Sequence, residues 1–225
     1  MKPRIAMLAA LPREVAPLVR DWRVHTLSHR EGTYIWECNR AIVVCAGMGR
    51  ERVTRALELA MSRGPVAEVI SVGYSGGLRA AMPMDKAYWP GTVIDDENGE
   101  RFECQGGSGT LVSTDHAVGR DEKAGLAARW NADFVDMEAA TVARLAQTHR
   151  LPFRAVRAIS DGVEDNLPDI GRFIDERGGF RERAFSMYVA LHPWLVPSAM
   201  RLGKQSACAS HSIAQALRLV LEQAE

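Results

Sequence analysis

The chain has 225 residues, of which 47% are hydrophobic and 25% are charged, and its formal net charge is +0. This length suits one domain with a sizeable core. The charge balance argues against electrostatic binding to nucleic acid and against a polybasic membrane anchor. No apolar run approaches the ~18 residues that a transmembrane helix needs. The apolar start of the chain is typical of a first core strand rather than of a signal peptide.

The cysteines and histidines show no metal-binding pattern. The four cysteines lack a CxxC spacing, and the six histidines lack an HExxH motif. We therefore expect no metal site and no metal cofactor. Dispersed cysteines of this kind are typical of reduced proteins, so we expect a cytoplasmic location.

Apolar runs typical of strands alternate with amphipathic runs typical of helices. The patterns predict strands at residues 5–11, 34–38, 41–46, 69–72, 92–94, 111–113, 134–135 and 156–159. They predict helices at 50–62, 120–130 and 139–149, and a mostly helical C-terminal third. The polar stretch 95–109 is expected to form a hairpin or an exposed loop. This alternation predicts a single domain over residues 1–225, a three-layer α/β/α fold with a central mixed, mostly parallel sheet.

The segment 132–165 combines a predicted strand, a helix and a second strand, and both strands run into acidic residues. Asp136 and Glu138 follow the first of these strands, and Asp161 follows the second. Open α/β sheets bind ligands at the carboxyl ends of their strands. Three carboxylates at that edge indicate a site that handles hydroxyl groups and protons. The alternative for each acid is a role in capping or opening a helix.

Two other strand ends add candidate residues. The first predicted strand ends at Leu11-Pro12-Arg13-Glu14, so Glu14 is either a first-turn helix acid or a further carboxylate of the site. The third ends in Ala46-Gly47-Met48-Gly49-Arg50, where the glycines allow either a tight turn or a close backbone approach to a ligand. The chain has no GxxxxGK[ST] motif, so a nucleotide-binding P-loop is not supported.

The fourth predicted strand ends in Gly73-Tyr74-Ser75-Gly76-Gly77, which matches the GxSxG elbow of serine hydrolases. Asp161, with His192 or His211, would complete a triad in the required order. The elbow also needs a helix directly after the serine. Residues 78–91 contain two prolines and show no clean helical face, so a serine hydrolase built on Ser75 is a secondary hypothesis.

These segments resemble the nucleoside phosphorylase/nucleosidase superfamily, which includes purine nucleoside phosphorylases and uridine phosphorylases. The matching pieces are IAMLAALPREV, CAGMGRERVTRALELA, VISVGYSGGL, LVSTD, FVDMEAATVARLA and LPFRAVRAISD, which span most of residues 4–161 in the family's order. The nearest branch is that of the 5′-methylthioadenosine/S-adenosylhomocysteine nucleosidases. In this comparison GYSGG lies where the family has a glycine-rich turn.

The resemblance implies cleavage of an N-ribosidic bond. Asp161 matches the family's general acid, which protonates the purine, and Glu14 matches the residue that activates the attacking water. Glu138 matches the residue that holds the ribose 2′- and 3′-hydroxyls, as an acceptor pair should. The implied substrate-binding set also includes residues that pack on the sugar, orient the acid or line the base and 5′ pockets: Met137, Asp136, Ser160, Met48, Tyr74, Ser75, Gly76, His116 and Val118.

Some residues depart from the family pattern. Many members place an aromatic residue over the purine where this chain has His116-Ala117-Val118, and Tyr74 replaces a small residue. The arginine motif with which phosphorylases bind phosphate is not visible. Arg13 or Arg50 could still bind phosphate as a co-substrate, so hydrolysis and phosphorolysis both stay open. No other cofactor is expected.

The tail, residues 190–225, resembles that of hopanoid-associated nucleosidases, which remove adenine from adenosylhopane. The resemblance therefore implies a nucleosidase of a 5′-modified adenosine, with adenosylhopane as the favoured substrate in hopanoid biosynthesis. A methylthioadenosine/S-adenosylhomocysteine nucleosidase and a phosphate-dependent phosphorylase are alternatives. A catalytically inactive nucleoside-binding module is a third hypothesis.

Apolar residues cluster in this tail at Trp194, Leu195, Val196, Ala199 and Met200. They are expected either to pack on the domain or a neighbouring subunit, or to form an apolar lid or a lip in peripheral contact with a membrane. Family members form dimers or larger assemblies, so the resemblance also implies a homodimer or larger homo-oligomer.

Overall fold

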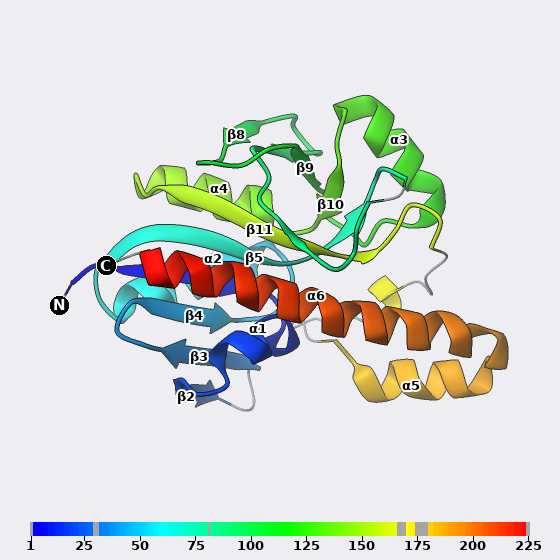
Figure 1. Cartoon of the computed structure of the whole chain (residues 1–225), viewed down its shortest axis with the longest axis horizontal. Coiled ribbons are helices and arrows are strands. Elements are labelled where there is room, and N and C mark those ends of the chain that lie inside the picture. Colours follow the sequence, from blue (N-terminus) through cyan, green and yellow to red (C-terminus); the bar gives the residue numbers. More distant parts are fainter. Residues whose placement is uncertain (1, 29–31, 81, 166–169, 174–179, 224–225) are drawn as a thin grey trace.

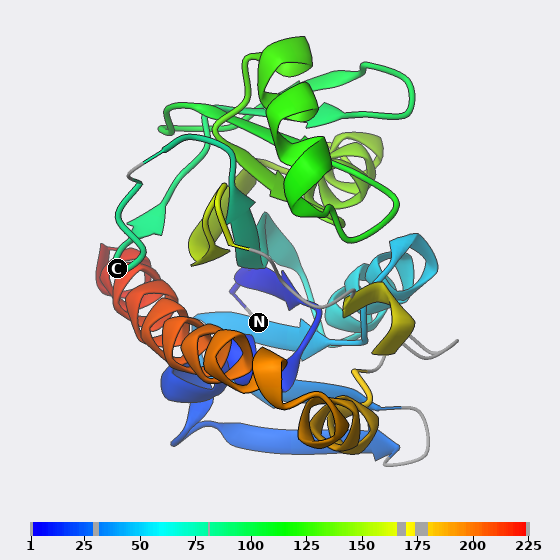
Figure 2. The same ribbon diagram turned by 90° about the vertical axis from the view of Figure 1, so that its right-hand side faces the viewer.

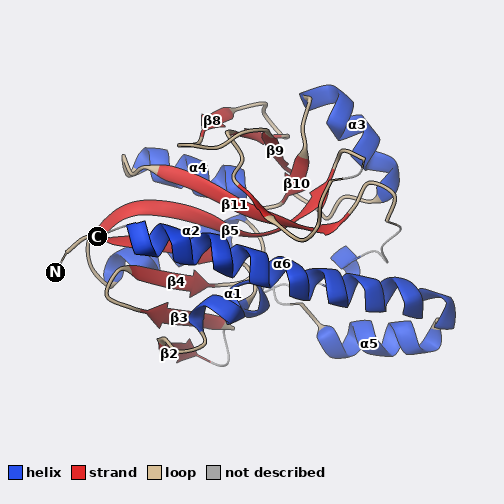
Figure 3. Ribbon diagram, viewed as in Figure 1, coloured by secondary structure: helices blue, strands red, loops and turns tan. Residues whose placement is uncertain are grey.

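The computed structural model describes residues 2–28, 32–80, 82–165, 170–173 and 180–223 (Figures 1 and 3). Its strands are β1 (Arg4–Ala9), β2 (Arg23–Ser28), β3 (Thr33–Glu37), β4 (Ala41–Cys45), β5 (Val66–Gly77), β6 (Ala87–Tyr88), β7 (Thr92–Asp95), β8 (Arg101–Glu103), β9 (Thr110–Ser113), β10 (Phe134–Asp136) and β11 (Phe153–Asp161). Its helices are α1 (Pro12–Val19), α2 (Arg50–Ser62), α3 (Arg120–Trp130), α4 (Ala139–Thr148), α5 (Glu182–Leu191) and α6 (Val196–Gln223), with short 3-10 helices η1 (Ile170–Phe173) and η2 (Pro193–Leu195).

The strands form one mixed sheet with the order β2-β3-β4-β1-β5-β10-β9-β7-β8, and β11 pairs with β5 and β6. The central strands β4, β1, β5 and β11 are parallel, as are β7, β9 and β10. Antiparallel pairing occurs at the edges, between β2, β3 and β4 and between β7 and β8, and where β10 meets the end of β5. The predicted mixed α/β fold is confirmed. The polar stretch after β7 forms a hairpin through β8.

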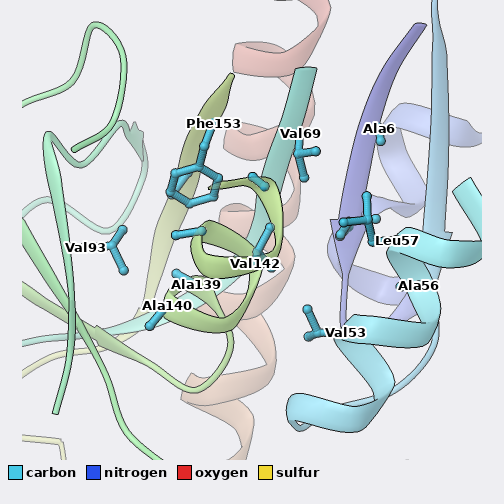
Figure 4. Close-up of a cluster of buried hydrophobic side chains, with 14 of the residues drawn as sticks. Ala6, Val53, Ala56, Leu57, Val69, Val93, Ala139, Ala140, Val142 and Phe153 are labelled. Atoms are coloured by element: carbon cyan, nitrogen blue, oxygen red, sulfur yellow. The ribbon is translucent and has the colours of Figure 1, made fainter. Parts of the chain in front are cut away.

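The central strands are buried on both faces, because helices cover both sides of the sheet. In β1, Ala6 and Leu8 face the core beneath α2 and α4, whereas Met7 faces the core beneath α1 and α6. This alternation follows from the two-residue period of a strand. Figure 4 shows the first core, in which Leu57 of α2 and Val142 of α4 are labelled. The predicted three layers are therefore present.

Strand β5 is longer than the four-residue strand predicted from its apolar run. It extends from Val66 to Gly77, so the whole GYSGG segment is strand. Its first part pairs with β1 and β11 on its two sides, and Gly76 and Gly77 pair with β10. The predicted glycine-rich turn was wrong, because neighbouring strands supply hydrogen-bond partners along the full segment. The local sequence carries no sign of those partners.

The C-terminal helix α6 has two different halves. Its second half lies on the sheet and against α1, with Ala209, Ile213 and Leu217 fully buried. Its first half extends beyond the sheet beside α5 (Figures 1 and 2). We call residues 182–208, which comprise α5, η2 and this first half, the tail hairpin. Among the described helices, none is long and apolar enough to cross a bilayer.

Candidate active site

A cavity of about 650 Å³ opens at the carboxyl ends of β1, β5, β10 and β11. Every residue that the sequence predicted for catalysis or substrate binding lines it: Glu14, Met48, Tyr74, Ser75, Gly76, His116, Val118, Asp136, Met137, Glu138, Ser160 and Asp161. The carboxyl ends of parallel strands meet at one edge of the sheet. This edge therefore collects acids that lie more than 140 positions apart in the chain. We call Glu14, Glu138 and Asp161 the sheet-edge site.

Glu14 lies in the first turn of α1, directly after β1, and is 5% exposed. Its Oε2 accepts hydrogen bonds from the backbone N–H of Ala10 at 3.0 Å and of Leu11 at 2.8 Å. Its Oε1 accepts one from the N–H of Tyr74 at 3.3 Å. Burial raises the pKa of Glu14, although these N–H donors and nearby arginines oppose the rise. The carboxylate therefore opens the helix and also faces the cavity in a fixed position.

Glu138 is half-buried at the start of α4, one residue after Met137. Its Oε1 accepts a hydrogen bond from the N–H of Gly49 at 3.3 Å. Gly49 has a φ of 99°, a conformation that favours glycine, which explains the glycine before α2. Burial, together with the charges of Asp136 and Glu14, raises the pKa of Glu138 to about 8. Glu138 therefore keeps its proton near neutral pH, because its ionised form would lie in a low-dielectric pocket beside the charges of Asp136 and Glu14.

Asp136 lies behind Glu138, with its carboxylate occupied by protein groups. Its Oδ1 accepts from the hydroxyl of Ser113 at 2.5 Å, and its Oδ2 accepts from the N–H of Ala139 at 2.9 Å. Oδ2 also forms a buried ion pair with the guanidinium of Arg157. Arg157 in turn donates to the carbonyl and hydroxyl oxygens of Ser71. These contacts hold the start of α4, and with it Glu138, against the sheet.

Asp161 ends β11, and both its carboxylate oxygens accept hydrogen bonds. Ser160 donates its hydroxyl to Oδ1 at 2.7 Å. The ammonium of Lys123 donates to Oδ2 at 2.5 Å and to the carbonyl of Gly162 at 2.7 Å. A Cβ at Gly76 would lie 3.3 Å from both this Oδ2 and Cε of Lys123. Gly76 therefore leaves the space in which the lysine and the carboxylate meet.

The sequence analysis missed Lys123, Arg157 and three apolar residues of the cavity wall: Phe180, Phe185 and Leu202. The two basic residues lie inside a helical and a strand pattern, where a cation normally indicates a solvent-exposed position. An available signal for Lys123 was its spacing, because it continues the helical face on which Leu126, Ala127 and Trp130 pack against a buried apolar cluster. The three apolar residues lie in the C-terminal part of the chain, whose local sequence gives no sign of its position in the fold.

The rim of the cavity carries the residues that depart from the family pattern. His116 is half-exposed between Asp115 and Glu122, at 2.7 Å and 3.2 Å, and its pKa is raised mainly by the hydrogen bond to Asp115. The hydroxyl of Tyr74 lies 2.6 Å from that of Ser210 in α6, and burial raises the pKa of Tyr74 to about 12. Tyr74 therefore ties β5 to the tail helix.

The serine-hydrolase hypothesis is wrong, because Ser75 lies inside strand β5 rather than at an elbow before a helix. Its buried hydroxyl has no hydrogen-bond partner among the described residues. The Nδ1 atom of His192 instead forms a hydrogen bond with the carbonyl of Tyr188, and that of His211 forms one with the carbonyl of Ala207. A nucleophilic serine needs a base within hydrogen-bond reach.

Within the described part of the chain, no His, Cys, Asp and Glu side chains gather in a group fit to hold a metal.

Known structures match the whole chain. A Helicobacter pylori MTAN mutant with 5′-methylthioadenosine in its active site has a TM-score of 0.72 at 16% identity, covering 99% of this chain and 100% of that one. A 5′-methylthioadenosine/S-adenosylhomocysteine nucleosidase from Colwellia psychrerythraea, in complex with adenine, has a TM-score of 0.72 at 16% identity, covering 100% and 95%. A futalosine hydrolase mutant of H. pylori has a TM-score of 0.70 at 16% identity, covering 99% and 100%. At this identity the likeness shows the fold.

The family of the chain follows from its match to a family model, not from a match to a single curated sequence. No curated protein sequence matches the chain. The family model described as the phosphorylase superfamily matches residues 4–108 and 103–190, which is most of the chain. The chain belongs to the phosphorylase superfamily.

Proposed function

We propose that the protein hydrolyses the N-ribosidic bond of a 5′-modified adenosine and releases adenine. The observation that carries this proposal is the sheet-edge site, where three acids from the ends of three strands face one cavity. Glycoside cleavage requires a proton for the leaving group, a group that activates water, and acceptors for the sugar hydroxyls. The site offers one carboxyl group for each task.

The division of tasks follows from the surroundings of each acid. Asp161, oriented by Ser160, delivers the proton to the leaving purine. Glu14, held by three backbone N–H groups, accepts a proton from the attacking water. Glu138 accepts hydrogen bonds from the ribose 2′- and 3′-hydroxyls, and Met137 beside it packs on the sugar. Asp136 acts behind Glu138 by fixing the start of α4.

The basic residues support hydrolysis over phosphorolysis. Arg50 forms ion pairs with Asp95 at 3.5 Å and with Glu97 at 2.6 Å, so its charge is already neutralised. The guanidinium of Arg13 lies over the ring of Phe180, 4.9 Å from the ring centroid. A phosphate in the cavity would also lie near the carboxyl group of Glu14, whose oxygens already accept hydrogen bonds and offer the anion no donor. Phosphate therefore remains the less favoured co-substrate.

Two observations support adenosine as the nucleoside. The motifs of the chain resemble those of a superfamily that acts on nucleosides. In addition, two structural neighbours contain 5′-methylthioadenosine and adenine, respectively. A further neighbour is a futalosine hydrolase, and futalosine is therefore one of the substrates in the test described below.

The tail supports an apolar 5′ group, and adenosylhopane is our favoured substrate. Phe180, Phe185, Ala199 and Leu202 line the same cavity as the sheet-edge site. The tail hairpin continues this apolar wall outward, with Leu191 and Met200 both 71% exposed. A long hydrocarbon bound there would cover surface that water now contacts. This arrangement also favours a peripheral contact of the hairpin with a membrane that holds the substrate.

The test is direct. The purified protein is incubated with 5′-methylthioadenosine, S-adenosylhomocysteine, futalosine and adenosylhopane in detergent, and free base is measured by chromatography. We expect adenine release, fastest from adenosylhopane and unchanged when phosphate is added. Release that requires phosphate would instead establish a phosphorylase. If no 5′-modified nucleoside loses its base, the proposal fails and the binding-module hypothesis takes its place.

We also propose a cytoplasmic homodimer or larger homo-oligomer. Mass measurement by light scattering over a range of protein concentrations tests the assembly. A monomer at all concentrations would contradict it.

A further inference from the structure

Lys123 is buried although nothing about its helix requires a buried cation. It is the one buried residue of α3, and it is 1% exposed. Burial of an ammonium costs free energy unless the charge is paired and hydrogen-bonded. An apolar residue at this position would dock the helix without that cost. The cost of burying this cation indicates that the lysine has a chemical task, and the inference about that task rests on the proposed function.

The ammonium of Lys123 has two partners and faces the cavity. Its Nζ lies 2.5 Å from Oδ2 of Asp161 and 2.7 Å from the carbonyl oxygen of Gly162. An ammonium has three N–H donors, so these contacts use two of them. Lys123 also lines the cavity into which Asp161 opens. The lysine and the carboxylate thus form one ion-paired unit in the cavity wall, where the proposed mechanism places the leaving base.

The hydrogen bonds of this unit indicate which group holds the proton for the leaving base. Asp161 accepts on both oxygens, from Ser160 on Oδ1 and from Lys123 on Oδ2. The proton that lies nearest to Oδ2 is bonded to Nζ of Lys123. We propose that Lys123 supplies the proton that Asp161 passes to the leaving purine. Because Lys123 acts through Asp161, it is a positioning residue that also stores a proton.

The step balances without another reactant. The bond between C1′ and N9 breaks, and its electron pair stays on the purine. Asp161 gives a proton to a ring nitrogen of the base as Nζ of Lys123 gives one to Asp161, which leaves a neutral amine. Water adds to C1′ and its proton passes to Glu14. Exchange with solvent then takes the proton from Glu14 and returns one to Lys123, so that nucleoside and water become base and sugar.

Two substitutions separate proton supply from a structural ion pair. Lys123→Arg keeps a positive charge that donates hydrogen bonds, but a guanidinium does not give up its proton in proteins. Lys123→Met keeps the length of the chain without a charge. Arg129→Met is the matched control, because Arg129 lies on the same helix and pairs with Asp96 outside the site. Thermal unfolding of each variant shows that it is folded, and if the Met variant does not fold, the Arg variant carries the test.

Each variant is assayed on two substrates with the same 5′ group, an adenosine and a 4-nitrophenyl β-ribofuranoside. Nitrophenolate leaves without a proton, whereas adenine needs one. We expect Lys123→Arg to lower kcat for the adenosine by about 10²-fold, with KM and the nitrophenyl rate within about threefold of the wild type. Arg129→Met should change neither rate.

Two results would overturn the inference. An equal loss on both substrates indicates that the lysine only supports the fold of the site. A wild-type rate for Lys123→Arg on the adenosine indicates that its charge alone is needed. If the wild type cleaves neither substrate, the proposed function itself fails, and this inference fails with it.

Discussion

The sheet-edge site and the tail hairpin differ in how their side chains are held. Both Glu14 and Asp161 are less than 10% exposed, and protein donors hold both oxygens of each carboxylate. In the tail hairpin, Met187, Leu191 and Trp194 are each about 70% exposed. The difference separates two tasks: bond cleavage requires fixed groups, whereas an exposed apolar surface is suited to binding a variable or lipid-like group.

The largest effect should come from the sheet-edge site itself. Asp161→Asn keeps the shape of the side chain but removes the carboxyl group that, in the proposed mechanism, passes a proton to the purine. We expect turnover to fall by about 10²–10⁴-fold, the usual contribution of a positioned acid, as measured by adenine release. Glu164→Gln is the control, because this exposed acid lies three residues further along and pairs with Arg120 at the surface. Wild-type turnover of the Asn variant would remove Asp161 from the mechanism.

The second test compares a buried and an exposed leucine within the second half of α6 by their effect on stability. Leu217 is fully buried in α6, whereas Leu219 on the same helix is 54% exposed. Leu217→Ala should lower the free energy of unfolding by about 2–5 kcal/mol, and Leu219→Ala should change it by about 0.5 kcal/mol or less. Urea unfolding measures both. Similar values for the two variants would mean that the second half of α6 is not docked on the sheet.

The third test uses the raised pKa of Glu138. Folding moves this pKa from an ordinary 4.5 to about 8, so the folded protein binds the proton more tightly than the unfolded chain. The contribution to stability is full below pH 4.5 and is lost as the pH rises through about 8. Glu138→Gln does not titrate, so its melting temperature relative to that of the wild type should be several degrees higher at pH 9 than at pH 5, because only the wild type loses this contribution over that range. A difference between the two proteins that does not change with pH would contradict the raised pKa.

The smallest effect on stability should come from the tail hairpin. Leu191→Ser and Met200→Ser replace exposed apolar side chains and should change the free energy of unfolding by about 0.5 kcal/mol or less. We expect unchanged kcat/KM on 5′-methylthioadenosine and a loss of about tenfold on a lipid-linked adenosine, because one apolar contact of about 1.5 kcal/mol is removed. Equal rates on the lipid-linked substrate would show that the hairpin does not bind the 5′ group.

The sequence alone predicted the layers and the acids of the site. Hydrophobic periodicity is a local property, so alternating strands and helices could be recognised, and with them the fold class. Parallel strands end at one edge of a sheet, so Glu14, Glu138 and Asp161 could be placed together before their distances were known. The motifs around them also indicated the superfamily that the family model confirms.

The tertiary structure decided what depends on partners far away in the chain. Lys123 meets Asp161 across 38 positions, and Asp136 meets Arg157 across 21. A strand through GYSGG is possible because β11, β1 and β10 pair with it. Such contacts arise from packing, and the local pattern of a segment contains no information on the group that will lie opposite it. For the same reason, only the structure distinguished the buried half of α6 from the exposed tail hairpin.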